Sequence, residues 1–362
     1  MWGNSQGGRR WQNFLTEDDK TGSYNEIQAG LARTQLECVP MPPRTVWEWV
    51  ETYGAMQADK EKVHGKWEDA KAEVEAIFEK SISKSSLNKV LDDTRNMAKS
   101  KAEAVFVNEG WASLELNRRE AKSESTLMCD HLEFAKAGDA QKCWLSLLND
   151  GTVGIYDAND APVSYQIKNE WLDMLKEAVL NKDKDNWYAH YLLGTALAVK
   201  GEYESAKKHL KKSIELEGNA WANYVIAMIC EMENDSESYV DYMLKAFKIK
   251  NDDISLAKDV FRCLHENEKS DDIIRLYETL SDAIKDIPRC KLYYSYALAR
   301  KGMIDEAENV ILNNGKYIEI ADIREAETSI TSLWMLINEK RGKSNEPPYA
   351  IDFRMSYNQK KG

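Results

Sequence analysis

The chain has 362 residues, of which 43% are hydrophobic and 30% charged, so it is long enough for two or three structural units with a buried core. Its net charge of −12 argues against a nucleic-acid partner, because a phosphate backbone requires a clustered basic surface and the sequence contains none. No run approaches the roughly 20 apolar residues of a membrane span, and the six cysteines are scattered without a CxxC pair. We therefore expect a cytoplasmic protein with free core thiols, no membrane partner, no metal and no cofactor.

The N-terminal part of the chain, residues 1–55, is predicted to be extended. The stretch "YNEIQAGLARTQLECVPMPPRTVWEWVETYG", residues 24–54, ends in a cluster of Trp and Glu. Alternation along a strand places Glu26 and Gln28 on one face and Ile27 on the other. Because two or three strands are marginal by themselves, we expect residues 1–55 to be the last strands of a β-sandwich that begins upstream of this chain.

Residues 56–148 are predicted to form a helical hairpin and a linker region, against which the first strands pack. Apolar residues recur every three or four positions from Val63 to Ile82, and again from Leu87 to Phe106. The polar stretch "SISKSS" separates these two amphipathic segments. Two such helices with a short break between them are typical of a helical hairpin.

The stretch "NDGTVGIYDANDAPV", residues 149–163, is dense in Gly, Asn, Asp and Pro. It lacks the glycine and the closing glutamate of a calcium-binding loop, so we expect a solvated connecting loop.

Residues 187–218, "WYAHYLLGTALAVKGEYESAKKHLKKSIELEG", have the spacing of a tetratricopeptide repeat. In this pattern Gly194 lies where two helices cross, Gly201 at the turn, and Ala206 where the second helix packs. The interval from Trp187 to Trp221 equals one period of that repeat.

The same pattern returns in "YYSYALARKGMIDEAENVIL". Gly302 and Ala307 each follow their counterparts Gly201 and Ala206 at a distance close to three periods. Two degenerate repeats are expected between them, the second with "HENEKSDD" as its turn. Stacked repeats share a continuous core, so we predict a mainly α protein with a superhelical array over 149–320 and a C-terminal helix and extended tail over 321–362.

Six segments carry a resemblance to one uncharacterised bacterial family. In chain order they are "WGNSQGGRRWQNFLTEDD", "YNEIQAGLARTQLE", "VHGKWEDAKAEVE", "NEGWASLE", "IADIREAETSITSLW" and "PPYAIDFRM". Members of that family resemble carbohydrate-active proteins in which a β-supersandwich similar to galactose mutarotase precedes a helical region and tetratricopeptide repeats. The resemblance implies that this chain is the C-terminal part of a longer glycan-binding or glycan-processing protein.

Carbohydrate chemistry requires acid and base carboxylates together with aromatic faces. Glu26 and Glu37 are the candidate catalytic residues, and Gln28, Arg33 and Trp47 are the candidate substrate-binding residues. The alternative for these polar residues is the exposed face of an edge strand, and for Trp47 a place in the core. Because the expected strands are incomplete, we expect the chain alone to be inactive.

Two functions stay open at this point. In the first, the chain belongs to a carbohydrate-active enzyme and the array is a structural scaffold. In the second, the chain is a non-enzymatic adaptor whose array groove captures a partner protein or peptide, or a second copy of itself.

Overall fold

The computed structural model describes residues 6–16, 27–34, 36–101, 103–107, 109–125, 131–324 and 327–354. The chain divides into two compact units. One contains helix α1 and the chain from Asp139 onward, and the other is Ile27–Gly138. The fold is mainly α, and no helix in the described ranges has the length and apolar character needed to cross a membrane.

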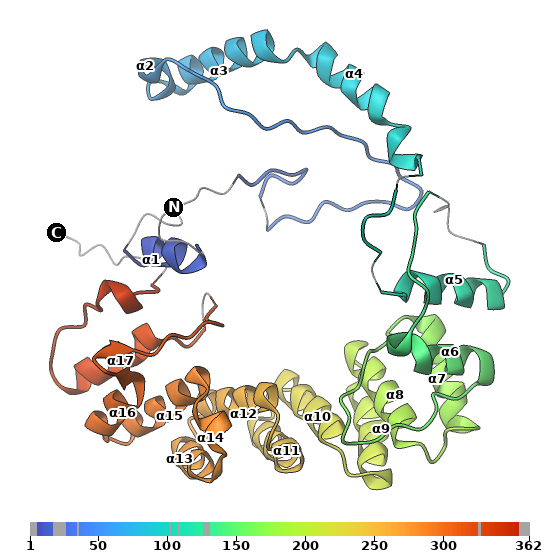
Figure 1. Ribbon diagram of the computed structural model, residues 1–362, viewed down its shortest axis with the longest axis vertical. Coiled ribbons are helices and arrows are strands. Elements are labelled where there is room, and N and C mark those ends of the chain that lie inside the picture. Colours follow the sequence, from blue (N-terminus) through green and yellow to red (C-terminus); the bar gives the residue numbers. More distant parts are fainter. Residues whose placement is uncertain are drawn as a thin grey trace. The chain divides into compact units, whose positions relative to one another are not determined.

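The centre of the first unit is a row of antiparallel helix pairs that follow one another in chain order (Figure 1). The first helix of each pair is called the A helix and the second the B helix. The four pairs are α8 (Trp187–Val199) with α9 (Tyr203–Leu216), α10 (Ala220–Met232) with α11 (Ser236–Ile249), α12 (Ile254–Glu266) with α13 (Ser270–Thr279), and α15 (Pro288–Arg300) with α16 (Ile304–Ile311). A short helix, α14 (Asp282–Lys285), precedes the last pair. These four pairs confirm the tetratricopeptide-like helical region.

The turn inside each pair has the same backbone geometry. Its left-handed residue is Gly201, Asn234, Glu268 or Gly302, and these follow one another at intervals that match the repeat period. In every case the backbone N–H of the residue after the left-handed one donates to the carbonyl five residues earlier. This bond satisfies a carbonyl at the end of the A helix that has no partner within the helix. The two degenerate repeats therefore keep the register of the glycine repeats, although a side chain occupies their left-handed position.

We expect the substitution Glu268→Gly to stabilise the protein by about 1 kcal/mol. Glu268 has φ = 57°, where an L side chain costs about 1–2 kcal/mol, and the extra backbone freedom of glycine offsets part of that gain. Urea unfolding of the two proteins measures the difference. Asn234→Gly is the matched control and should gain less, because asparagine tolerates this conformation. A Glu268→Gly protein no more stable than wild type would contradict the assignment of strain to this turn.

The row is preceded by a pair with a long connection. Helix α6 (Lys142–Asp150) follows the short 3-10 helix η2 (Asp139–Gln141), and α7 (Asn169–Leu180) packs on α8. The rings of Trp144 and Trp171 meet edge to face at 5.6 Å, and both are buried. The connection, residues 151–168, is called the strap. It is far longer than the turns within the four pairs.

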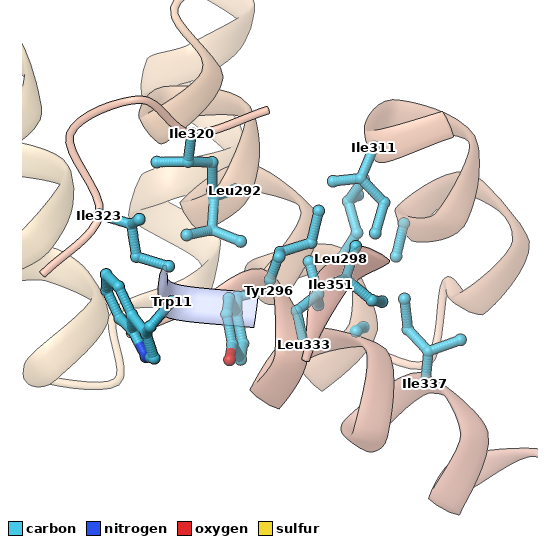
Figure 2. Packing of buried hydrophobic residues seen from close by; sticks show 13 residues of the cluster. Trp11, Leu292, Tyr296, Leu298, Ile311, Ile320, Ile323, Leu333, Ile337 and Ile351 are labelled. Carbon is cyan, nitrogen blue, oxygen red and sulfur yellow. The ribbon is translucent and has the colours of Figure 1, made fainter. Parts of the chain in front are cut away.

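At the other end, helix α1 (Gln6–Leu15) packs against the end of the described chain. The Trp11 indole Nε1 donates to the Phe353 carbonyl at 2.9 Å, and the two rings meet edge to face. Trp11 belongs to one buried cluster with residues of α15, α16 and α17, and Figure 2 shows it beside Tyr296 and Ile323. A Cβ on Gly7 would lie 1.9 Å from the Arg354 carbonyl oxygen, so only glycine allows this approach.

The remaining elements of the first unit follow the last helix pair of the row. They are the hairpin β1 (Leu312–Asn313) and β2 (Lys316–Tyr317), helix α17 (Ile330–Lys340) and the 3-10 helix η3 (Tyr349–Ile351). The connection from 312 to 329 is again long. It carries Ile320 and Ile323 into the buried cluster.

The second unit contains α2 (Lys60–Val63), α3 (Trp67–Ser81), α4 (Lys84–Thr94), η1 (Met97–Lys99) and α5 (Trp111–Ala121). The helices predicted from the periodicity are present, but the predicted hairpin is wrong. Ile82 and Ser83 both have extended backbones, and α4 continues outward from α3 instead of folding back (Figure 1). Trp67 is 75% exposed, and no residue of α3 is fully buried.

The predicted strands in residues 1–55 are also wrong where the structure describes them. Residues 6–15 are helix α1, which packs on the C-terminal cluster. Residues 27–34 and 36–54 contain no strand. Pro40, Pro42 and Pro43 remove three amide donors, and no strand in the part of the chain that the structure describes supplies partners for the others. The described residues therefore hold no remnant of a β-sandwich.

Candidate functional site

The A helices line a groove with two cavities in it. The aromatic cavity, of about 330 Å³, lies over α8, α10 and α12, and the strap forms one of its walls. The charged cavity, of about 490 Å³, lies over α12 and α15, and the connection between α16 and α17 forms one of its walls. Asp259 lines both cavities, so they are neighbouring parts of one groove.

The aromatic cavity is built from residues at helical spacing on successive A helices. Tyr191 comes from α8, Trp221 and Tyr224 come from α10, and Tyr165 comes from the strap. The Tyr224 hydroxyl donates to the Asp259 carboxylate at 2.8 Å. Burial, and then the negative charge of Asp259, raise the pKa of Tyr224, so this hydroxyl stays a neutral donor at physiological pH.

The charged cavity surrounds a buried arginine, Arg289, which is 7% exposed. Its guanidinium donates to the Asp322 carboxylate at 3.0 Å and pairs with Glu327 at 3.1 Å. Lys258 binds the other oxygen of Asp322 at 2.6 Å. Burial disfavours the Asp322 carboxylate, but Lys258 and Arg289 outweigh it and hold the pKa of Asp322 below its usual range. The arginine thus holds the connection from α16 to α17 against α15.

Two further charged residues of this cavity make weaker contacts. Arg262 lies 3.8 Å from Asp259 and 3.9 Å from Glu266, which is beyond hydrogen-bond distance. Burial raises the pKa of Glu266, and the nearby Glu231 adds to this effect while Arg262 opposes it. Arg262 is therefore available to a ligand to a greater extent than Arg289.

The strap is held on the array through its backbone. The carbonyls of alternate residues accept bonds from side chains at the start of two A helices. The carbonyl of Gly154 accepts from Asn186 at 2.7 Å, that of Tyr156 from Trp187 at 2.9 Å, and that of Ala158 from Trp221 at 3.1 Å. Alternate carbonyls of an extended chain point in the same direction, so one row of donors can hold them all.

The predicted connecting loop over residues 149–163 is present from residue 151 onward, but it is held on the array and is only partly solvated. Val153 is 1% exposed and Ala158 is 8% exposed, although the composition of the segment is that of a loop. Two tryptophans in the sequence could have indicated that this loop packs on the array. Trp187 and Trp221 stand at matching positions of two repeats, and a buried indole N–H needs an acceptor.

The residues proposed for carbohydrate chemistry lie elsewhere in the chain. Glu26 is outside the described residues. Glu37 pairs with Arg33 at 3.2 Å, with the Arg33 side chain 89% exposed and that of Glu37 40% exposed. Gln28 is exposed and Trp47 is half-buried. The structure brings Arg33 and Glu37 together, and their role in catalysis or binding stays a prediction.

Two charged residues of the charged cavity, Arg324 and Glu327, lie close together in sequence. Neither of them lies in a helix, and no ion pair joins them in the described chain. Glu327 binds Arg289, which lies in α15, far earlier in the chain. A pairing at this separation cannot be read from local spacing.

The chain matches no family model and none of the curated protein sequences compared with it. Among solved structures, the crystal structure of MamA protein is 21% identical with a TM-score of 0.33, covering 39% of this chain and 78% of that chain. The structure of YrrB, described as a TPR protein with an unusual peptide-binding site, is 17% identical with a TM-score of 0.31, covering 39% of this chain and 76% of that chain.

Proposed function

We propose that the array is a scaffold that binds a partner protein through a peptide segment laid in the groove of the A helices. The observation that carries this proposal is the continuity of the aromatic and charged cavities over α8, α10, α12 and α15. Such a groove offers apolar contact area together with a few fixed polar groups, which is the combination found in ligand sites.

The structural arrangement supports a rigid binding surface. Each pair contacts its neighbours in the row, so the A helices are held in a fixed order along the groove. The long connections at the two ends each add a wall to one cavity. A preorganised groove loses little freedom when a partner binds, and this favours affinity.

A peptide-display library panned on the full chain tests this function. We expect enriched peptides to bind the wild-type protein and to lose at least tenfold in affinity to the variant Val225→Glu, which places a charge in the aromatic cavity. Leu180→Glu is the matched control, because Leu180 is 77% exposed and lines neither cavity. A library that yields no binder sensitive to Val225→Glu would refute the groove as the binding site.

The carbohydrate-related function implied by the resemblance stays a prediction, and so do the roles of Glu26 and Glu37. Its assay is a glycan panel offered to the full chain and to a Glu37→Gln variant. Turnover abolished by that substitution would favour the enzyme hypothesis over the scaffold.

A further inference from the structure

The aromatic cavity has a lining whose charged residues all carry the same sign. Of the described residues that line it, the charged ones are Asp253 and Asp259, and no lysine, arginine or histidine is among them. The strap, which forms one wall, is acidic too, since residues 151–167 contain Asp157 and Asp160 and neither lysine nor arginine. The charged cavity differs, because cationic and anionic side chains both line it. An occupant of the aromatic cavity therefore enters a negatively charged environment.

The two carboxylates of this cavity are only partly neutralised by the described chain. Asp253 has no lysine or arginine within ion-pair distance there, and it accepts the Leu256 amide at 2.8 Å as the N-cap of α12. The positive end of the helix dipole is equivalent to about half a charge, so it offsets only part of the charge on Asp253. Asp259 accepts from the neutral hydroxyl of Tyr224, and Arg262 lies 3.8 Å away, beyond hydrogen-bond distance, in the lining of the charged cavity. Both aspartates can therefore pair with a cation that enters the aromatic cavity.

Four aromatic side chains line the cavity together with the carboxylates, namely Tyr165, Tyr191, Trp221 and Tyr224. The polar atoms of two of them already have partners, since the Trp221 indole N–H donates to the strap and the Tyr224 hydroxyl donates to an aspartate. These two side chains therefore offer a ligand ring surface and no free donor. The face of an aromatic ring is negative and attracts a cation within about 6 Å, most strongly for tryptophan. The rings and the carboxylates thus favour the same occupant, a cation.

The size and chemistry of the cavity select among cations. Its volume of about 330 Å³ is at the lower end of the range of ligand pockets, about 300–1,000 Å³, so it suits a single side chain. A guanidinium group is planar and weakly hydrated, and it can stack on rings while its N–H groups bind a carboxylate. The ammonium group of a lysine is more strongly hydrated and loses more when water is excluded. Over longer distances, the net charge of −12 attracts a cationic partner of either kind.

We propose that the aromatic cavity binds an arginine side chain of the partner segment, held by the aromatic rings and by the carboxylates of Asp253 and Asp259. The inference rests on the proposed scaffold function and specifies the side chain that the partner supplies. Peptides enriched by display on the full chain give the first test, because those that occupy the groove should share an arginine at one position.

A pair of substitutions at Val225 reports the sign of the occupant's charge. Val225→Glu and Val225→Lys both take up space in the aromatic cavity, so both should weaken the binding of any peptide seated there. The lysine also repels an arginine, whereas the glutamate attracts it. A peptide whose arginine occupies the cavity should therefore lose at least about fivefold more affinity to Val225→Lys than to Val225→Glu. Equal losses, or a larger loss to Val225→Glu, would overturn the inference.

The carboxylates are tested with one enriched peptide, labelled with fluorescein, and with matched peptides that carry lysine or glutamine in place of its arginine. Fluorescence anisotropy on the wild-type chain should show a loss of about threefold for lysine and at least about tenfold for glutamine. Asp253→Asn and Asp259→Asn should each weaken the arginine peptide about five- to tenfold and leave the glutamine peptide unchanged. Asparagine also caps a helix, and its amide oxygen can accept from Tyr224, so both variants should fold. Circular dichroism checks this.

Asp252→Asn is the matched control, because Asp252 is exposed and lines neither the aromatic nor the charged cavity. It removes the same charge from the chain and should leave the affinity for the arginine peptide within about twofold. A loss as large as that of Asp253→Asn would mean that the attraction is long-range, and the site would be refuted. If the groove-dependent peptides share an apolar, acidic or lysine residue instead of arginine, the inference fails and the scaffold function stands. If display yields no groove-dependent peptide, both fail.

Discussion

Replacing Gly194 with leucine is expected to destabilise the protein by about 3 kcal/mol, at the upper end of the cost of overpacking a core. A Cβ at this position would lie 2.6 Å from Leu210 Cγ and 3.2 Å from the Ala206 carbonyl oxygen. Leu210 and Ala206 are fully buried on α9, so they have no space to move into. Helices α8 and α9 would have to separate. Urea unfolding measures the loss.

The control for this experiment is Gly218→Leu. A Cβ on Gly218 has no heavy atom within 4 Å, so the same change of residue type should cost little there. An unchanged stability of Gly194→Leu would mean that α8 and α9 do not cross at this residue, and the repeat register would be wrong.

The second large effect concerns pH. Burial, and then the positive charge of Arg300, lower the pKa of His265 to about 4. An exposed histidine titrates near 6.5, so between about pH 6.5 and 4 His265 is protonated in the unfolded chain but neutral in the folded chain. The neutral His265 therefore contributes its full stabilisation to the folded state above pH 6.5, and this stabilisation is lost as the pH falls. At pH 5 the loss from this residue amounts to about 2 kcal/mol.

The side chain of His265 has an environment that explains the shift. It is 7% exposed and lies against the rings of Tyr293 and Tyr296, at centroid distances of 5.1 and 4.7 Å. Its Nδ1 is buried and has no hydrogen-bond partner. A proton on the ring would thus bring a charge into an apolar site without compensation.

The measurement compares urea unfolding at pH 7.5 and pH 5.0 for wild type and His265→Phe. The variant should lose about 2 kcal/mol less than wild type between these two values. Burial also lowers the pKa of His209 to about 4, and that of His190, so the variant should keep a residual loss in the same direction. His64→Gln is the control, because His64 is exposed and its substitution should leave the difference unchanged. A wild-type protein equally stable at both pH values would contradict the buried neutral histidine.

The repeat array could be predicted from sequence because its determinants are local and recur. Gly194 and Ala206 mark a helix crossing at fixed spacing, and Gly201 marks the turn. The same arguments placed the turn "HENEKSDD", although its left-handed residue is Glu268 and not glycine. The period of the repeat identified that position where the residue type did not.

The N-terminal segment, residues 1–55, and the groove could not be predicted, because their structure depends on distant partners. Alternation in residues 24–54 suggested strands, but a strand also requires a neighbour, and the described chain provides none. Helix α1 is stabilised by Phe353. The cavities depend on Asp322 meeting Arg289 and on Ala158 meeting Trp221, pairs whose separation in sequence exceeds any local pattern.

The contact between Trp11 and Phe353 joins residues 342 positions apart, whereas the pairs of the array contact near neighbours in sequence. On a ribosome that adds about 5–20 residues per second, Trp11 is made roughly 20 to 70 seconds before the carbonyl that it binds. The repeats can pack one after another as they emerge, since each needs only the one before it. Helix α1 must meanwhile keep its apolar face from other chains until Phe353 has been made. The docking of the oldest described helix onto the youngest described segment is therefore expected to come after the packing of the repeats.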